Sequence, residues 1–128
     1  MFIMDKFMEV PVAVKAMTMN NLEVAVLELK GSFLGGNETN ELKTAAADLF
    51  EQGNRKLVLD LGGVTYLNSM GIGALVSIYT MYAKDKGRIN LCQMGKNIQN
   101  TFVITKLITI FDIEEKREES IKKLQSEQ

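Results

Sequence analysis

One hexapeptide constrains the fold of this chain more than any other stretch: Lys56-Leu57-Val58-Leu59-Asp60-Leu61. It is mostly apolar and is followed at once by Gly62-Gly63. A short apolar run of this kind is typical of a strand buried on both faces, as parallel strands are in α/β folds. Helical patterns precede and follow the run, so the sequence predicts a parallel sheet covered by helices.

The other strands follow from alternating apolar positions and turn residues. Two alternating runs, Val10–Lys15 and Val24–Leu29, flank the turn signal Asn20-Asn21 and predict a β-hairpin near the N-terminus. Arg88–Cys92 is a further short strand, and one more is expected near the C-terminal end.

Four helices are expected from apolar residues at helical spacing. Their expected limits are Asn37 to a stop at Gly53, Met70–Lys86, a helix opened by Gly95-Lys96-Asn97, and Glu114–Gln125. Asn37 is the candidate N-cap of the first helix, and Asn68 and Ser69 stand where the second needs one. The second should bury a stripe made of Ile72, Leu75, Val76, Tyr79 and Ala83. Only Ile121 and Leu124 face inward from the last helix, so we expect it to be the least stable.

These elements add up to an α/β fold in a single domain, residues 10–126, preceded by an N-terminal extension, residues 1–9. The sheet is expected to be mixed, with four to five strands and an N-terminal hairpin, and about four helices cover it.

The residue inventory excludes several function classes. The chain has no histidine, which rules out Ser-His-Asp and Cys-His catalysis and removes the commonest metal ligand. Its carboxylates, such as Asp60 and Asp112, show no ligand spacing, and Asp60 is interpreted as a structural hydrogen-bond acceptor. We therefore expect no catalytic residues, no metal and no cofactor, and hence no enzyme.

Charge and hydropathy indicate where the protein is located and which classes of partner it does not bind. Lys and Arg total 15 against 16 for Asp and Glu, which argues against binding to nucleic acid. No apolar run approaches the roughly 20 residues that a membrane-spanning helix needs. The lone Cys92, expected to be buried, fits a reducing compartment, so a cytoplasmic protein without a membrane span is expected.

The segment from the predicted strand into the second helix, residues 57–73, is the most informative for function. It does not form a nucleophile elbow, because Leu67 stands where the first glycine of Gly-x-Ser-x-Gly would be. It is not a dinucleotide fingerprint either, because Val76 replaces the third glycine. Gly71 and Gly73 lie in the first helical turn, where glycine lowers helix stability but lets another backbone approach closely.

Six segments together resemble the STAS domain, the fold shared by anti-anti-sigma factors and the cytoplasmic tails of sulphate transporters. The resemblance covers about residues 10–124, and the loop at residues 68–73 is its specific part. The segments are Gly31-Ser32-Phe33-Leu34, Glu41-Leu42, Leu57–Leu61, Asn68–Gly73, Gly87-Arg88-Ile89 and Leu107–Ile113.

The resemblance implies an anti-sigma factor antagonist that works as a phospho-switch. The family's loop usually reads Asp-Ser-Ser/Thr-Gly-Leu-Gly, and its first hydroxyl is phosphorylated by a partner serine kinase that is also an anti-sigma factor. Carried over, that hydroxyl is on Ser69, while Asn68 replaces the Asp and Met70 replaces the second hydroxyl residue. The unphosphorylated protein would bind the partner, phosphorylation would release it, and a dedicated phosphatase would reset the protein.

Physical chemistry supports a switch at this place. The N–H groups and dipole of a helix start favour a phosphate, which adds about −1.5 to −2 charges to the surface. The expected partner-binding residues are Asn68, Ser69, Met70, Gly71, Ile72, Gly73 and, from a neighbouring loop, Asn37. We expect Tyr66 to be half-buried. The eight methionines are interpreted chiefly as core filling and initiation, and a place on the rim of this surface stays open for Met70 and Met94.

Two other interpretations remain open. Because Asn68 and Met70 depart from the family loop, the domain could be a scaffold that binds partners without being phosphorylated. It could instead sense a nucleotide or small anion at the same helix start. In either case we expect a monomer or a weak homodimer, since the edge of the hairpin can pair with another chain.

Overall fold

A computed structural model of the 128-residue chain describes residues 14–18 and 24–126. Its centre is a five-stranded sheet with the strand order β1-β2-β3-β4-β5. The strands are β1 (Val14–Thr18), β2 (Val24–Phe33), β3 (Lys56–Leu67), β4 (Arg88–Cys92) and β5 (Asp112–Glu114). Only β1 runs antiparallel to its neighbour, whereas β2 to β5 are mutually parallel. The predicted mixed sheet and α/β class are confirmed.

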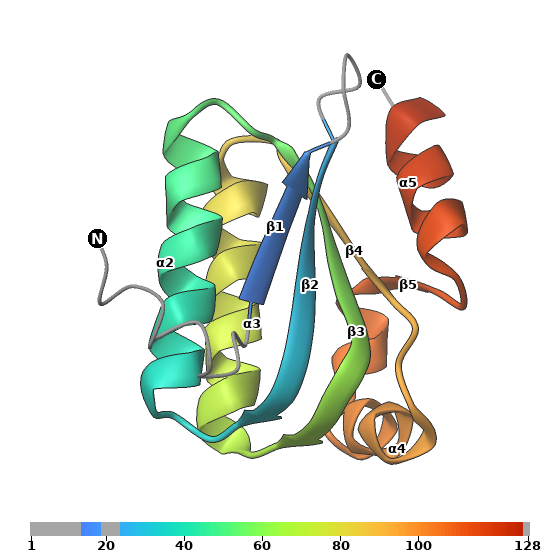
Figure 1. Ribbon diagram of the computed structural model, residues 1–128. Coiled ribbons are helices and arrows are strands. Elements are labelled where there is room, and N and C mark those ends of the chain that lie inside the picture. Colours follow the sequence, from blue (N-terminus) through green and yellow to red (C-terminus); the bar gives the residue numbers. More distant parts are fainter. Residues whose placement is uncertain (1–13, 19–23, 127–128) are drawn as a thin grey trace.

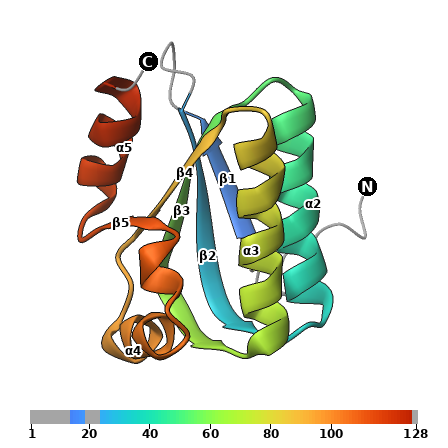
Figure 2. The ribbon, with the colours of Figure 1, turned by 180° about the vertical axis from the view of Figure 1, so that it is seen from behind.

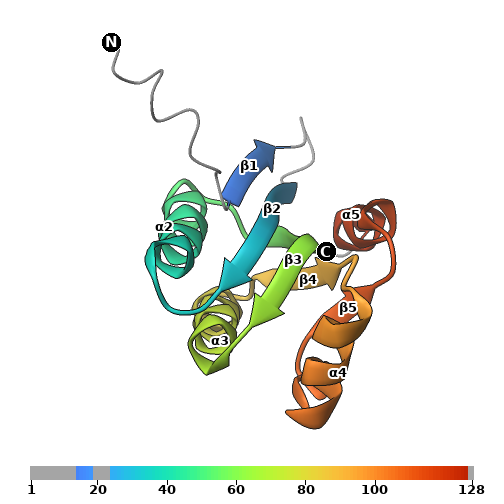
Figure 3. The same ribbon diagram turned by 60° about the horizontal axis from the view of Figure 1, so that its bottom comes forward.

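The helices lie on both faces of this sheet (Figure 1). They are α2 (Asn37–Glu51), α3 (Ser69–Lys84), α4 (Lys96–Ile104), the short 3₁₀ helix η1 (Leu107–Thr109) and α5 (Arg117–Ser126). Figure 2 shows the sheet from the side on which α2 and α3 pack against it, with α5 on the opposite side. Figure 3 brings forward the end where β2 and β3 finish, near which α4 lies.

The two faces of the sheet bury very different amounts of apolar side chain. Among the described residues, 23 buried apolar residues form the main core and five form a second cluster. Successive residues of a strand point to opposite faces, so Leu57 and Leu59 enter the main core whereas Val58 joins the second cluster. This explains why consecutive residues of the hexapeptide, from Leu57 to Leu59, are all apolar.

Strand β3 runs beyond its predicted end at Leu61 and continues through Gly62-Gly63 to Leu67. The register between β2 and β3 shifts at two places, between Glu28 and Lys30 and between Gly31 and Ser32. A Cβ on Gly63 would lie 2.9 Å from the carbonyl oxygen of Leu29. The glycines therefore permit a close approach at an irregularity in the ladder, which is a known role of glycine within strands.

Helix α3 is turned relative to its predicted orientation. Its buried residues are Gly71, Ala74, Leu75, Ile78 and Tyr82. Of the predicted stripe, Leu75 is buried, Ile72, Val76 and Tyr79 are partly buried, and Ala83 is exposed. Small residues at positions 71 and 74 face the sheet because the helix packs close to it there, which hydrophobicity alone does not predict.

The last helix is shorter than predicted. It begins at Arg117, because Glu114 belongs to strand β5. Leu124 is buried and Ile121 is half-buried, as expected, but Ser120 is fully buried as well. The sequence did not predict the burial of Ser120, because a buried serine needs hydrogen-bond partners that come from elsewhere in the fold.

Several predictions fall outside the described residues: the extension at residues 1–9, the turn Asn20-Asn21 and the beginning of the first strand before Val14. In the described part of the chain, no helix combines the length and apolarity needed to cross a membrane.

Candidate functional site

Asn68 closes the start of helix α3 and ties it to the loop that follows β2. Its side-chain oxygen Oδ1 accepts the backbone N–H groups of Met70 and Gly71, each at 3.0 Å. Its Nδ2 donates to the carbonyl oxygen of Leu34 at 3.1 Å. Of the two predicted N-cap candidates, Asn68 therefore fills this role and Ser69 does not.

Ser69 is the first residue of α3, and it is exposed. Within the described part of the chain, its hydroxyl makes no hydrogen bond. Asn68 caps the helix, and the exposed Ser69 lies beside the positive end of the helix dipole.

The two glycines of the loop have different surroundings. A Cβ on Gly71 would lie 2.3 Å from the carbonyl oxygen of Phe33, and Gly71 is buried. A Cβ on Gly73 would meet nothing within 4 Å, and Gly73 is exposed. Gly71 thus permits the close contact between α3 and the end of β2, whereas Gly73 and the half-buried Ile72 lie at the surface.

The loop before α2 packs against the Ser69 loop, as predicted. A Cβ on Gly35 would lie 2.9 Å from the Cβ of Met70, and Gly35 itself has φ +99°. Asn37 is exposed and is the first residue of α2, so its predicted role as N-cap is wrong, since Gly36 holds that position. The side chains of Glu38 and Thr39 hold the loop instead.

Glu38 binds this loop through its carboxylate. Oε2 accepts the backbone N–H groups of Leu34 at 2.9 Å and Gly36 at 3.0 Å, and the hydroxyl of Thr39 at 3.1 Å. The Thr39 hydroxyl in turn accepts the N–H of Gly35 at 2.9 Å. The backbone hydrogen bonds, led by that from Leu34, lower the pKa of Glu38 to about 2.

Three large apolar side chains are exposed around Ser69, and we call them the apolar rim: Leu34 (47 % exposed), Tyr66 (60 %) and Met70 (60 %). Met70 is exposed, whereas Met94 is buried and does not belong to the rim. Tyr66 is exposed, so the prediction that it is half-buried is wrong. Leu34 was missed, although its signal was present: it follows the fully buried Phe33 and points the other way.

A hollow of about 660 Å³ extends from Ser69 along the outer side of α3. Its lining residues are Ser69, Ile72, Gly73, Val76, Ser77, Thr80, Met81, Lys84 and Thr105. The Ser69 end of the molecule thus combines a free hydroxyl, an apolar rim and a concave surface.

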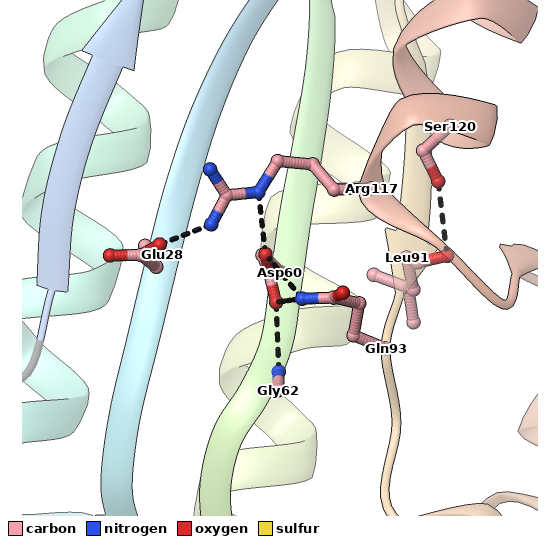
Figure 4. Close-up of polar contacts among 7 residues, drawn as sticks. All are labelled: Glu28, Asp60, Gly62, Leu91, Gln93, Arg117 and Ser120. Atoms are coloured by element: carbon pink, nitrogen blue, oxygen red, sulfur yellow. Dashed lines mark hydrogen bonds and ion pairs between the residues drawn. The ribbon is translucent and has the colours of Figure 1, made fainter.

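A second polar cluster lies on the opposite face of the sheet, centred on the buried Asp60 (Figure 4). The carboxylate accepts the N–H of Gly62 at 2.8 Å, the amide Nε2 of Gln93 at 2.9 Å and Nε of Arg117 at 2.7 Å. Arg117 also pairs with Glu28. The interpretation of Asp60 as a structural hydrogen-bond acceptor is confirmed.

Cys92 is fully buried near this cluster, as predicted. Burial, reinforced by the negative charge of Asp60, raises the pKa of its thiol to about 12, so the thiol is protonated at neutral pH. Among the described residues, no group of three or more Cys, Asp or Glu side chains is arranged to hold a metal ion.

The chain resembles known proteins in sequence and in fold. BtrV of Bordetella bronchiseptica, a candidate anti-sigma factor antagonist by name, is 22 % identical over 102 residues, which cover 80 % of this chain and 88 % of BtrV. The crystal structure of TM1081 of Thermotoga maritima, another candidate antagonist, matches with a TM-score of 0.79 at 18 % identity, over 87 % of this chain and 93 % of that one.

The anti-sigma factor antagonist SpoIIAA matches in both of its forms. Its unphosphorylated form gives a TM-score of 0.71 at 14 % identity, over 90 % of this chain and all of that one. The phosphorylated form of the Bacillus protein gives 0.69 at 17 % identity, over 88 % and 99 %. The family model of the STAS domain matches residues 15–120. Together with the five-stranded sheet and its helices, this match shows that the chain belongs to the STAS domain family.

Proposed function

We propose that this protein is an anti-sigma factor antagonist controlled by phosphorylation of Ser69. In the unphosphorylated form, its Ser69 end binds an anti-sigma factor that is also a serine kinase, and so frees a sigma factor in the cytoplasm. Phosphorylation by that partner releases it, and a phosphatase restores the binding form. The protein acts by binding and is not itself an enzyme, and it needs no cofactor, nucleic acid or membrane.

The observation that carries this proposal is the free hydroxyl of Ser69 at the start of α3. Asn68 supplies the N-cap, so modification of Ser69 would break no hydrogen bond that holds the helix. The positive end of the helix dipole would stabilise a phosphate there. Phosphorylation is therefore compatible with the folded domain, and its effect falls on the surface.

The surroundings explain why a phosphate would release a partner. Ser69 is followed by the exposed Met70, and Leu34 and Tyr66 complete the apolar rim. A partner that covers this rim removes it from water, so a phosphate with about −1.5 to −2 charges would be buried without a matching cation. Losses of several kcal/mol, or a few powers of ten in affinity, are expected of such a mismatch.

The two departures from the family loop have local explanations. An amide at position 68 donates from Nδ2 to the Leu34 carbonyl oxygen, and a carboxylate could not make that bond. Met70 packs against Gly35 and adds to the apolar rim. Both side chains contribute to the surface beside Ser69, and neither forms a hydrogen bond with its hydroxyl. This favours the switch over an unmodified scaffold.

The first test is mass spectrometry of the protein purified from its native cells during growth and under stress. We expect one phosphoryl group on Ser69 whose occupancy changes with condition, and none after Ser69→Ala. Ser126→Ala is the matched control, because Ser126 is also an exposed helical serine but belongs to α5. Ser69→Glu should abolish capture of an anti-sigma factor that the wild type and Ser126→Glu retain.

Two outcomes would contradict the proposal. If Ser69 is unmodified in every condition while an anti-sigma factor is still captured, the domain is a constitutive scaffold. If neither a phosphate nor an anti-sigma factor is found, and a nucleotide raises the thermal stability, the domain senses a ligand. A nucleotide at 100 times its Kd would add about 2.7 kcal/mol of stability.

A further inference from the structure

Helix α5 covers the second face of the sheet with little apolar contact. The cluster beneath it consists of Val24, Val26, Val58, Cys92 and Leu124. Of these only Leu124 belongs to α5, and the half-buried Ile121 packs against the cluster. Since apolar burial is the main favourable term in folding, α5 is held far less firmly by it than α2 and α3 are by the main core.

Polar contacts hold the beginning of α5 instead (Figure 4). Arg117 donates from Nε to Asp60 at 2.7 Å and pairs with Glu28. One turn later the buried Ser120 hydroxyl contacts Asn90 and lies 3.4 Å from the Leu91 carbonyl oxygen. We call the contacts of Arg117 and Ser120 the α5 latch.

Opening the latch leaves few groups unsatisfied. Asp60 keeps the N–H of Gly62 and the amide of Gln93, both supplied from outside α5. Arg117 and Glu28 are partly exposed already and would regain water. The Nδ2 of Asn90 is buried and has no hydrogen-bond partner among the described residues, so opening would let it bind water.

We infer that α5 is a lid: it swings away from the sheet while the rest of the domain stays folded, and the opening exposes Cys92. The hinge is the two-residue link of Glu115 and Lys116 between β5 and α5. Neither β5 nor α5 contributes a residue to the Ser69 end. The opening of α5 therefore does not depend on the proposed switch. Local openings of this kind lie below global unfolding in free energy.

The chain carries its own reporter, because Cys92 is its single cysteine. Cys92 of the full-length protein would be labelled with a disulfide reagent such as dithionitrobenzoate at increasing urea concentrations below the unfolding transition. Wild type should label at a rate nearly independent of urea, since a local opening exposes little surface. Cys92→Ala provides the blank.

Arg117→Met removes the charged part of the latch and keeps most of its stem. The labelling rate should rise about tenfold or more, as expected from the loss of hydrogen bonds between charged groups. Arg55→Met is the matched control: it loses an ion pair with Asp85, which joins two sites away from α5. That control should leave the labelling rate at low urea unchanged.

A milder variant keeps the test decisive if Arg117→Met does not fold. Glu28→Gln weakens the latch without leaving a buried charge alone, and it should raise the rate by a smaller factor. Amide hydrogen exchange should show residues 117–126 exchanging before residues 69–84. The lid is refuted if Cys92 labels only with the steep urea dependence of global unfolding, or if the Arg117 and Arg55 variants raise the rate equally.

Discussion

The two faces of the sheet hold their helices by different kinds of contact. On one, α2 and α3 are held by a core of 23 buried apolar residues, with glycine and alanine of α3 turned toward the strands. On the other, α5 contributes Leu124 to a cluster of only five buried apolar residues, and its beginning is held by Arg117 and Ser120. Apolar packing of the first kind resists any local change, whereas a few polar contacts can be exchanged for water at small net cost. The difference separates a rigid face from one that can open.

The largest expected effect comes from truncating one leucine on each face. Leu75 and Leu124 are both buried, at 0 % and 1 % exposure. Leu75→Ala should lower the free energy of unfolding by about 2–5 kcal/mol, since it leaves a void in a core that cannot collapse. Leu124→Ala should cost less, because α5 can shift to fill the space. Urea denaturation of both variants measures this, and equal losses would mean that α5 is held as tightly as α3.

A second pair of variants tests the close contact on the rigid face. In Gly71→Ala the new Cβ meets the Phe33 carbonyl oxygen at 2.3 Å, so the free energy of unfolding should fall by about 1–3 kcal/mol. Gly73→Ala, two residues along the same helix, enters open space and should raise it by up to about 1 kcal/mol. The two variants should thus differ in sign in urea denaturation, and a wild-type stability for Gly71→Ala would disprove the close contact.

The smallest expected effect is a loss of stability at low pH that originates at the start of α2. The folded pKa of Glu38 is about 2, below its ordinary value of 4.5, because backbone N–H groups bind the carboxylate. The stability it contributes is therefore fully present above about pH 4.5 and is lost as the pH falls toward 2. Glu38→Gln should flatten the fall in thermal stability within this window. If the variant follows the wild-type curve, the loop before α2 is not held by this carboxylate.

Most of the architecture could be predicted because it is encoded in local patterns. The order of strands and helices follows from hydrophobic periodicity, and the mostly apolar hexapeptide indicates a sheet covered on both faces. The predictions were wrong where a tertiary contact overrode a local sequence pattern. Gly62-Gly63 signals a strand end in isolation, yet the approach of Leu29 keeps it within β3.

The helix start near residues 68–70 was predicted from the sequence, but the residue that caps it was not singled out. Asn68 and Ser69 are both good N-caps, and only the bond from Asn68 to Leu34 selects between them. The α5 latch could not be predicted at all, because Arg117 and Asp60 are 57 positions apart and no periodicity links them. Long-range polar pairs depend on how the folded helices and strands pack against one another.

The cap at Asn68 has a consequence for any enzyme that modifies Ser69. The serine is already wound into the first turn of a helix, and three hydrogen bonds of its neighbour hold that shape. Such an enzyme meets a folded surface made of two loops, which follow the ends of the parallel strands β2 and β3, instead of an extended stretch of chain. Its specificity must then be conformational, and a short synthetic peptide spanning residues 64–74 would be a poor substrate even though it contains every residue of the loop.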